Sequence, residues 1–167
     1  MKTDEKIGPQ RYRERFGRYF EEFTVGDVYE HRPGRTINEA DNTWFTLLTM
    51  NQHPVHFDHE YASRSEFSKP LVASPLTLAI LVGQSVSDVS QLAIANLGWT
   101  DVKMTRPVFV GDTLYSETEV IGKRESKSRA RQGIVTVRTT GRNQHGEIVC
   151  TFDRSILIPF TGHGVED

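Results

Sequence analysis

The chain has 167 residues, 37% hydrophobic, 25% charged and 10% aromatic, a composition typical of one globular domain with a sizeable core. Its formal net charge of −2 provides no positive field for nucleic acid or an anionic membrane, and no apolar run approaches the roughly twenty residues of a membrane span. The single cysteine, Cys150, excludes an intrachain disulfide, and the charged start MKTDEKIGPQ lacks an apolar signal region. We therefore expect a soluble cytoplasmic protein that binds neither nucleic acid nor a membrane.

The start of the chain differs in composition from the rest. Residues 1–18 are polar and rich in Arg and Glu, and we expect an N-terminal arm or a short helix there. A single domain is expected over 19–160, followed by a C-terminal tail over 161–167. Within the domain, Gly26-Asp27 predicts a turn before a short strand that ends near Thr36.

Two helices are expected in the first half of the domain. Asn38 or Thr36 can cap the first helix, which continues through apolar residues with helical spacing to Leu48. The second lies in SPLTLAILVGQSVSDVSQLA, with Ser74 as its N-cap and the helix extending over 75–93. Its first half is apolar nearly all round and must be buried on most sides, whereas its polar second half is expected to emerge toward solvent or a partner.

The remainder of the chain has the alternation of strands. The expected strands are 97–106, 114–124, 133–141 and 147–158. Asn143–Gly146 predicts the hairpin connection between the last two. One buried helix followed by about four long antiparallel strands indicates an α+β fold in which a sheet wraps a helix.

A histidine-rich stretch, MNQHPVHFDHEYA (50–62), precedes the buried helix. The three-residue spacing of His53, His56 and His59 does not place the three side chains on one face of a helix, and it does not place them on one face of a strand. No other His or Cys pair in the sequence has the spacing of metal ligands. A metal site is therefore disfavoured. Asp58 is expected to cap a short helix, which leaves His53 and His59 as surface groups. His56, at the edge of an apolar segment, is the candidate proton carrier near neutral pH.

The segment NQHPVHFD resembles the signature Asp-x-Asn-Pro-(Ile/Leu/Val)-His-x-Asp of the MaoC-like dehydratases, the (R)-specific enoyl-CoA hydratase group of the hotdog fold. Pro54, Val55, His56 and Asp58 match this signature. The order of the surrounding segments is also similar: a VGD turn, a helix, a central helix, RPVFVGDTL and NQHGEIV. The resemblance covers about 19–158 and implies a single hotdog domain, an antiparallel sheet wrapped around a long central helix.

The resemblance also implies an activity. In that family the motif binds the water that adds across an enoyl double bond, and the start of the central helix polarises the thioester carbonyl. It implies an enoyl-CoA hydratase or 3-hydroxyacyl-CoA dehydratase, a hydro-lyase with His56 and Asn51 as catalytic residues. Coenzyme A enters as part of the substrate, without a separate cofactor or metal, and a homodimer or larger homo-oligomer is expected. The expected substrate-binding residues are Met50, Ser74, Pro75, Leu76 and Thr77.

Two positions depart from the family pattern. Asn51 stands where the family has its catalytic Asp, and an amide can hold water but cannot take its proton. Either His56 acts alone, or a carboxylate (Asp41, Asp58 or Glu60) substitutes, or the substrate assists, or the chain is not catalytic. At the helix start, Ala73-Ser74-Pro75 replaces a His-Gly, so one backbone donor is lost and the Ser74 hydroxyl can replace it.

Both departures resemble the mesaconyl-CoA hydratase, or β-methylmalyl-CoA dehydratase, branch, as do GRTINEADN, ANLGWTDVKMTRPVF and GKRESKSR. Those proteins are commonly longer, with a second hotdog half. A small, branched, carboxylated acyl group is then implied. Arg35, Arg64 or Arg106 can pair with its carboxylate, although the sequence equally allows each to be a solvated surface charge. The basic segment 123–131 is either a contact for the coenzyme A phosphates or a solvated hairpin.

Two other functions compete with hydration. A thioesterase of the same fold usually presents a carboxylate near the central helix, and the helix start ASPLTLAILVGQS has none. A non-catalytic acyl-CoA-binding partner subunit is favoured by Asn51. A thioesterase releases coenzyme A as a free thiol, whereas a hydratase adds water and leaves the thioester intact. A binding subunit catalyses neither reaction.

Overall fold

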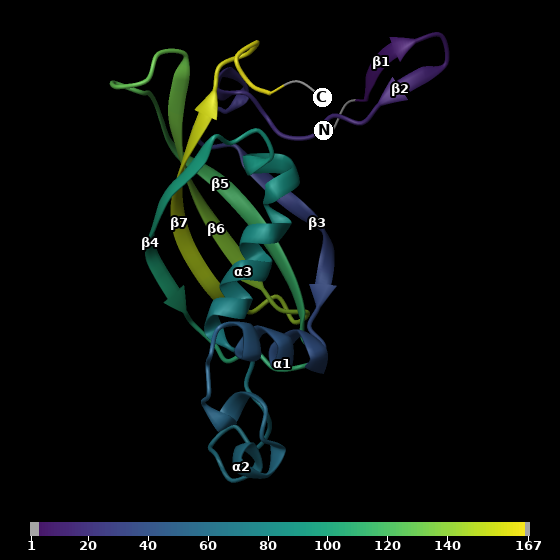
Figure 1. The fold of residues 1–167 in the computed structure, drawn as a ribbon, viewed down its shortest axis with the longest axis vertical. Coiled ribbons are helices and arrows are strands. Elements are labelled where there is room, and N and C mark those ends of the chain that lie inside the picture. The colour runs from purple at the N-terminus through teal and green to yellow at the C-terminus, as the bar shows by residue number, and fades with distance from the viewer. Residues whose placement is uncertain (1–3, 166–167) are drawn as a thin grey trace.

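A curved antiparallel sheet of five strands wraps around one helix, α3, in the computed structural model, which describes residues 4–165 (Figure 1). The strand order is β3-β5-β6-β7-β4, so β3 and β4 form the two edges. The bounds are β3 (Val28–Thr36), β4 (Ala95–Met104), β5 (Thr113–Glu125), β6 (Gln132–Arg142) and β7 (Ile148–Pro159). The expected α+β hotdog architecture is therefore confirmed.

The short helices lie at one end of the sheet, between β3 and α3 (Figure 1). They are α1 (Glu39–Leu48), the 3-10 turn η2 (Pro54–His56) and α2 (His59–Ser63); a further 3-10 turn, η1 (Phe20–Glu22), precedes β3. Asn38 is the cap of α1, because its side chain accepts a hydrogen bond from the Asp41 N–H at 3.0 Å. Asp58 caps α2 by accepting from the Tyr61 N–H at 2.9 Å, as the sequence predicted.

The central helix differs from its expected form at both ends. It spans Ser74–Gln84, and its N-cap is Ala73, whose carbonyl accepts from the N–H groups of Leu76 at 2.9 Å and Thr77 at 3.2 Å. The prediction of Ser74 as N-cap was therefore wrong by one residue. A five-residue π-helical turn, η3 (Val86–Ser90), follows in place of a continuous helix to Ala93.

Two apolar clusters form the core, and the first of them packs the sheet against α3. One lies toward α1 and the other toward η1 and η3. The side chains of β5 alternate as predicted, with Leu114, Ser116, Thr118 and Val120 buried. The largest fully buried side chains of the first cluster are Ile37, Leu81, Leu114 and Phe152, and those of the second are Phe23, Ile156 and Ile158.

A layer of polar side chains separates the two clusters. His31 is buried; its Nδ1 lies 3.1 Å from Asp88 Oδ2, and its Nε2 lies 2.7 Å from Thr118 Oγ1. The fully buried Ser85 accepts from the buried Arg154 guanidinium at 2.9 Å. The expectation that the polar residues after Gln84 emerge from the fold was therefore wrong for Ser85, because groups of the sheet satisfy it in the interior.

This layer makes the stability of the fold depend on pH. Burial lowers the pKa of His31, and the neighbouring charges of Arg154 and Arg18 act in the same direction against the opposing effect of Asp88. An unfolded histidine has a pKa of about 6.5. Below that value the unfolded state binds more protons than the folded state, so the stabilisation present at higher pH is lost as the pH falls through the lower folded pKa.

We expect the melting temperature of the protein to fall between about pH 7.5 and pH 5. In His31→Gln the side chain stays polar but cannot titrate, so this fall should become smaller. Circular dichroism recorded during thermal unfolding at several pH values gives the melting temperatures of the wild type and of His31→Gln. An equal fall in the two proteins would contradict the assignment to His31.

The N-terminal segment forms a hairpin of β1 (Glu5–Gly8) and β2 (Arg11–Arg13), which projects from the sheet (Figure 1). The short helix considered for this segment was therefore wrong. Residues 1–3 of the expected arm and 166–167 of the expected tail lie outside the described residues. No helix in the described part of the chain is long and apolar enough to cross a membrane.

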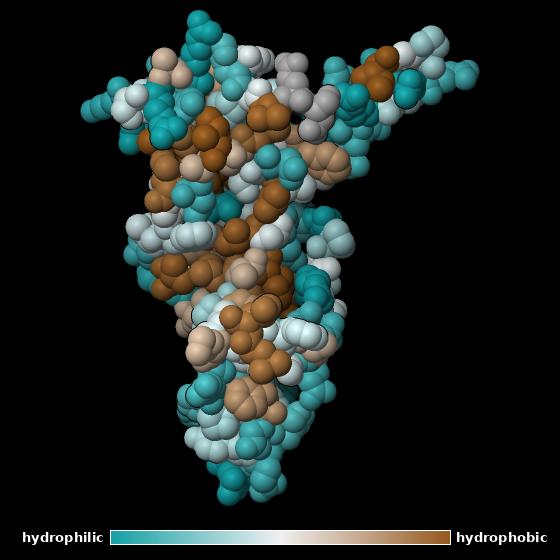
Figure 2. All heavy atoms as spheres, viewed as in Figure 1, coloured by the Kyte–Doolittle hydropathy of each residue, from teal (hydrophilic) through white to brown (hydrophobic). Residues whose placement is uncertain are grey.

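One face of the molecule is strongly apolar. Figure 2 shows apolar side chains gathered along α3 and toward β4. The edge strand β4 is exposed at nearly every residue. Large exposed apolar side chains on and beside these elements include Trp44, Leu47, Leu48, Leu97, Trp99, Val102 and Met104. A surface of this kind typically marks an interaction site.

Candidate active site

The turn η2 presents His56 at the end of the sheet that carries the short helices. Pro54 is at the start of this turn, and the His53 side chain caps it by accepting from the Val55 N–H at 3.2 Å. His56 Nδ1 lies 2.8 Å from the Leu71 carbonyl oxygen. Because a carbonyl only accepts, Nδ1 carries the hydrogen, and Nε2 of the neutral ring has a free lone pair. Among residues 4–165 no group bonds Nε2, so it can accept a proton from water.

Asn42 of α1 connects this histidine to the central helix. Its side chain is 1% exposed, and Nδ2 donates to the carbonyl oxygens of His56 at 2.8 Å and Leu71 at 3.1 Å. Its Oδ1 accepts from the Ala73 N–H at 3.0 Å. The sequence prediction missed Asn42, because a polar residue within a helical pattern carries no sign of partners 14 to 31 residues away.

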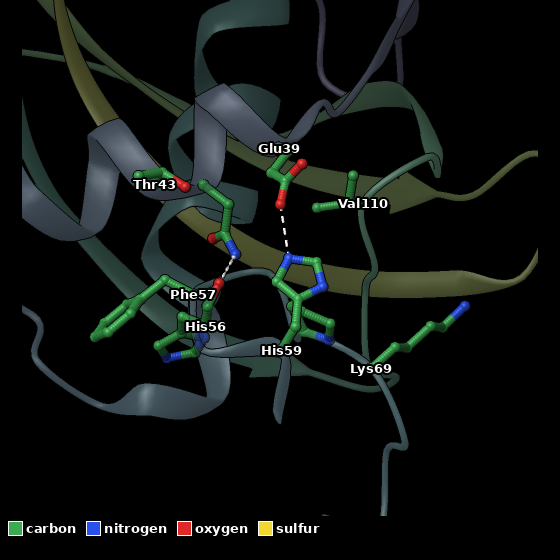
Figure 3. Close-up of a pocket in the computed structure, with 9 residues that line it drawn as sticks. Glu39, Thr43, His56, Phe57, His59, Lys69 and Val110 are labelled. Carbon is green, nitrogen blue, oxygen red and sulfur yellow. Dashed lines mark hydrogen bonds and ion pairs between the residues drawn. The ribbon is translucent and has the colours of Figure 1, made fainter. Parts of the chain in front are cut away.

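A cavity of about 240 Å³ lies beside η2. His56, Asn42, Glu39 and His59 are among its lining residues. His59 Nε2 lies 2.6 Å from Glu39 Oε1, and in Figure 3 the His56 ring lies apart from this pair. His59 is therefore engaged at the surface, as predicted. Within the described residues no group of three or more His, Cys, Asp or Glu is placed to hold a metal ion.

The start of α3 lines a second cavity of about 220 Å³, together with Leu71, Thr77 and Arg106. The free hydrogen-bond donors at this end of α3 belong to Ser74. Pro75 has no N–H, and the next two N–H groups, of Leu76 and Thr77, already donate to the Ala73 carbonyl. The Ser74 N–H has no hydrogen-bond partner within residues 4–165. Its N–H and hydroxyl can therefore bind a carbonyl oxygen, with the positive end of the helix dipole behind them.

The other predicted site residues, Met50, Asn51, Pro75 and Leu76, are not among the residues that line these two cavities. Asn51 Oδ1 accepts from the His53 N–H at 3.2 Å, so the amide shapes the turn before η2. Met50 is 80% exposed, with a left-handed backbone at φ 55°. Pro75 is exposed, whereas Leu76 is buried in the core. The structure therefore brings His56, Ser74 and Thr77 to cavities and leaves Met50 on the open surface.

The three carboxylates considered as substitutes for the family Asp do not line the His56 cavity. Asp41 accepts from the Asn38 N–H at 2.8 Å and pairs with Arg35 at 2.6 Å; these contacts outweigh burial and lower its pKa, which weakens it as a base. Asp58 is the α2 cap, and Glu60 is exposed near Arg64. Glu39 is the carboxylate that lines the cavity, and it is bonded to His59.

The basic segment 123–131 lies at the far end of the sheet from α2, where β5 turns into β6 (Figure 1). The thirteen residues of β5 span about 40 Å at roughly 3.3 Å per residue. Lys123 is engaged within its own chain, because it donates to the Phe23 carbonyl at 2.7 Å. The segment is therefore a hairpin remote from His56 of the same chain.

A five-stranded antiparallel sheet around a central helix, with a histidine-bearing turn ahead of that helix, defines the hotdog class of MaoC-like proteins. A family model described as mesaconyl-CoA hydratase matches residues 7–165. The chain belongs to the mesaconyl-CoA hydratase family, which confirms the resemblance drawn from the motif and its neighbours.

Individual relatives support the same family assignment. A mesaconyl-CoA hydratase of Cereibacter sphaeroides is 33% identical over 142 residues, covering 85% of this chain and 41% of that protein. The MaoC-like dehydratase structure from Rhodospirillum rubrum has a TM-score of 0.76 at 28% identity, covering 86% of this chain and 98% of that one. A Mycobacterium tuberculosis protein with a double hotdog fold has a TM-score of 0.79 at 26% identity, covering 90% and 48%. The chain thus spans about two fifths of the hydratase and about half of the double hotdog protein.

Proposed function

We propose that this chain catalyses the reversible addition of water to an enoyl-CoA thioester. The observation that carries the proposal is the geometry of His56, whose Nδ1–H is bonded to the Leu71 carbonyl so that Nε2 accepts a proton. The sequence relationship to a mesaconyl-CoA hydratase supports the same reaction. Coenzyme A enters as part of the substrate, and the proposed reaction needs no other cofactor.

The proposed chemistry uses two groups of the chain. His56 Nε2 takes a proton from water while the water oxygen bonds to the β-carbon, and the double-bond electrons move toward the thioester carbonyl. The Ser74 N–H and hydroxyl stabilise the resulting enolate oxygen. The histidine then returns its proton to the α-carbon, so one water is added and the thioester bond is not broken.

For the substrate, we propose a small, branched acyl group with a free carboxylate, such as mesaconyl-CoA. Arg106 lines the cavity that contains Ser74, and its NH1 lies 3.6 Å from Glu147, an exposed and weak pairing. Arg35 instead is bonded to Asp41 at 2.6 Å, and Arg64 lies near Glu60 at 3.8 Å. Arg106 is therefore the arginine of the three that we assign to the substrate carboxylate.

We also propose that the active form is a homodimer or a larger homo-oligomer. The edge strand β4 and the apolar face along α3 are uncovered in one chain (Figure 2). An uncovered edge strand of this kind is a template for pairing with another chain. A second copy placed there would cover the apolar face and supply a second hotdog unit, as the double hotdog protein of Mycobacterium tuberculosis has in one chain.

One observation favours a competing function. Asn51 cannot act as a base, and its Oδ1 already accepts from the His53 N–H. A chain that relies on His56 alone can have lost catalysis and kept acyl-CoA binding. A non-catalytic acyl-CoA-binding subunit is therefore the second candidate.

Absorbance of the enoyl-thioester band, followed with crotonyl-CoA and mesaconyl-CoA, tests these proposals. We expect the band to disappear without release of free thiol, faster for mesaconyl-CoA. Arg106→Gln should lower the ratio of mesaconyl-CoA to crotonyl-CoA turnover, and dilution below the dissociation constant of the oligomer should lower the specific activity. Thiol release would indicate a thioesterase, and thioester binding without turnover would indicate the binding subunit.

A further inference from the structure

We propose that Asn42 is a positioning residue, which holds His56 in the ring orientation and tautomer that leave Nε2 as the proton acceptor. The inference rests on the proposed function of His56 as the base. It adds a residue of α1 to a site that the motif region and the central helix otherwise supply.

The Asn42 side chain uses every hydrogen-bonding group of its amide. Asn42 uses both N–H hydrogens and its oxygen, on the carbonyls of His56 and Leu71 and on the N–H of Ala73. These partners belong to η2, to the segment before α3 and to the N-cap of α3. One side chain therefore fixes three segments relative to one another.

The side chains of Asn42 and His56 share the carbonyl oxygen of Leu71. This oxygen accepts from His56 Nδ1 at 2.8 Å and from Asn42 Nδ2 at 3.1 Å. Asn42 also fixes the backbone of His56 itself, through the carbonyl at 2.8 Å. The hydrogen bond from His56 to Leu71 sets the tautomer of the histidine, and the Asn42 amide is bonded to both of these residues.

The Asn42 side chain is buried. Asn42 is 1% exposed and Ala73 is fully buried, so removal of the amide leaves the Ala73 N–H without its acceptor in the interior. It also frees the carbonyls of His56 and Leu71 from the amide that joins them. A histidine without a fixed acceptor for Nδ1–H can rotate or place its hydrogen on Nε2. Either change removes the lone pair that the proposed base needs, although the His56 side chain itself remains.

The test compares Asn42→Ala with Asn143→Ala. Asn143 is also buried, and its amide makes a similar set of bonds, to Glu147 and His145 in the hairpin between β6 and β7. It therefore controls for the loss of a buried asparagine away from the histidine. Nitrogen-15 NMR of the imidazole rings reports the tautomer of His56, and a His56→Asn sample assigns its signals.

In the wild type we expect the neutral His56 ring to carry its hydrogen on Nδ1. In Asn42→Ala the signals should move toward the Nε2–H tautomer, and kcat on enoyl-CoA should fall about 10- to 100-fold with a smaller change in KM. Asn143→Ala should change neither the tautomer nor kcat on crotonyl-CoA, which has no free carboxylate for Arg106 to bind. Circular dichroism checks that each variant is folded, and Asn42→Ser provides a milder second variant.

An unchanged tautomer in folded Asn42→Ala, or an Nε2–H tautomer in the wild type, would overturn the proposal. Failure of both Asn42 variants to fold would also reject it, because the amide would then serve the stability of the domain. If the wild type hydrates neither thioester, the proposed function fails, whereas the NMR comparison still decides whether Asn42 sets the tautomer.

Discussion

His56→Asn should abolish most of the hydratase activity, with kcat lowered about 10²- to 10⁴-fold, the usual contribution of a positioned general acid–base group. Asparagine is informative because its Nδ2–H can replace the histidine Nδ1–H as a donor to the Leu71 carbonyl. The structural hydrogen bond is then kept while the proton acceptor is removed. The rate of loss of the enoyl-thioester band measures the effect.

The neighbouring histidines provide matched controls for this variant. His59→Ala removes the surface pair with Glu39, and His53→Ala removes a cap of η2. We expect kcat within a few-fold of the wild type for His59→Ala, and a moderate loss for His53→Ala because its turn carries His56. Wild-type kcat in His56→Asn would reject His56 as the base and would favour an assisting substrate.

Leu81→Ala should lower the free energy of unfolding by about 2 to 5 kcal/mol, which is the range for a large-to-small change in a packed core. Leu81 is fully buried on α3. Its side chain occupies the space above Gly141 of β6, where a Cβ on the glycine would collide with it. The contact holds the helix against the sheet, so a cavity there loosens the element that carries Ser74. Urea unfolding measures the change.

The same contact predicts a coupling between the two positions. Gly141→Ala alone should destabilise the protein by about 1 to 3 kcal/mol, because the buried leucine has no room to move. In the Leu81→Ala background the added methyl group should cost less or even stabilise the protein. Gly122→Ala is the control, since a Cβ there meets Thr136 at an ordinary 3.6 Å. Additive effects of the two substitutions would show that the leucine and the glycine do not share one space.

The local patterns of the sequence were sufficient for most of the sheet and for the buried helix, but not for the N-terminal hairpin or the end of α3 at Gln84. Alternation in 114–124 predicted which side chains of β5 face the core, because side chains of a strand point to opposite faces in turn. The apolar run after Ser74 predicted a buried helix, although its N-cap was displaced by one residue. The motif around His56, together with the order of the segments around it, was sufficient for the family.

Only the tertiary structure decided which polar groups meet. The bonds of Asn42 to Leu71 and Ala73 join residues 29 and 31 positions apart, and the contact of His31 with Asp88 joins residues 57 apart. The same holds for the burial of Ser85 and for the cavity that Arg106 and Ser74 both line, which depend on how the sheet curves around α3. Hydrogen bonds of this kind follow from distances that no periodic pattern encodes. The sequence therefore determined the family, the buried helix and most of the strands, and only the fold showed that Asn42 and His56 share the Leu71 carbonyl.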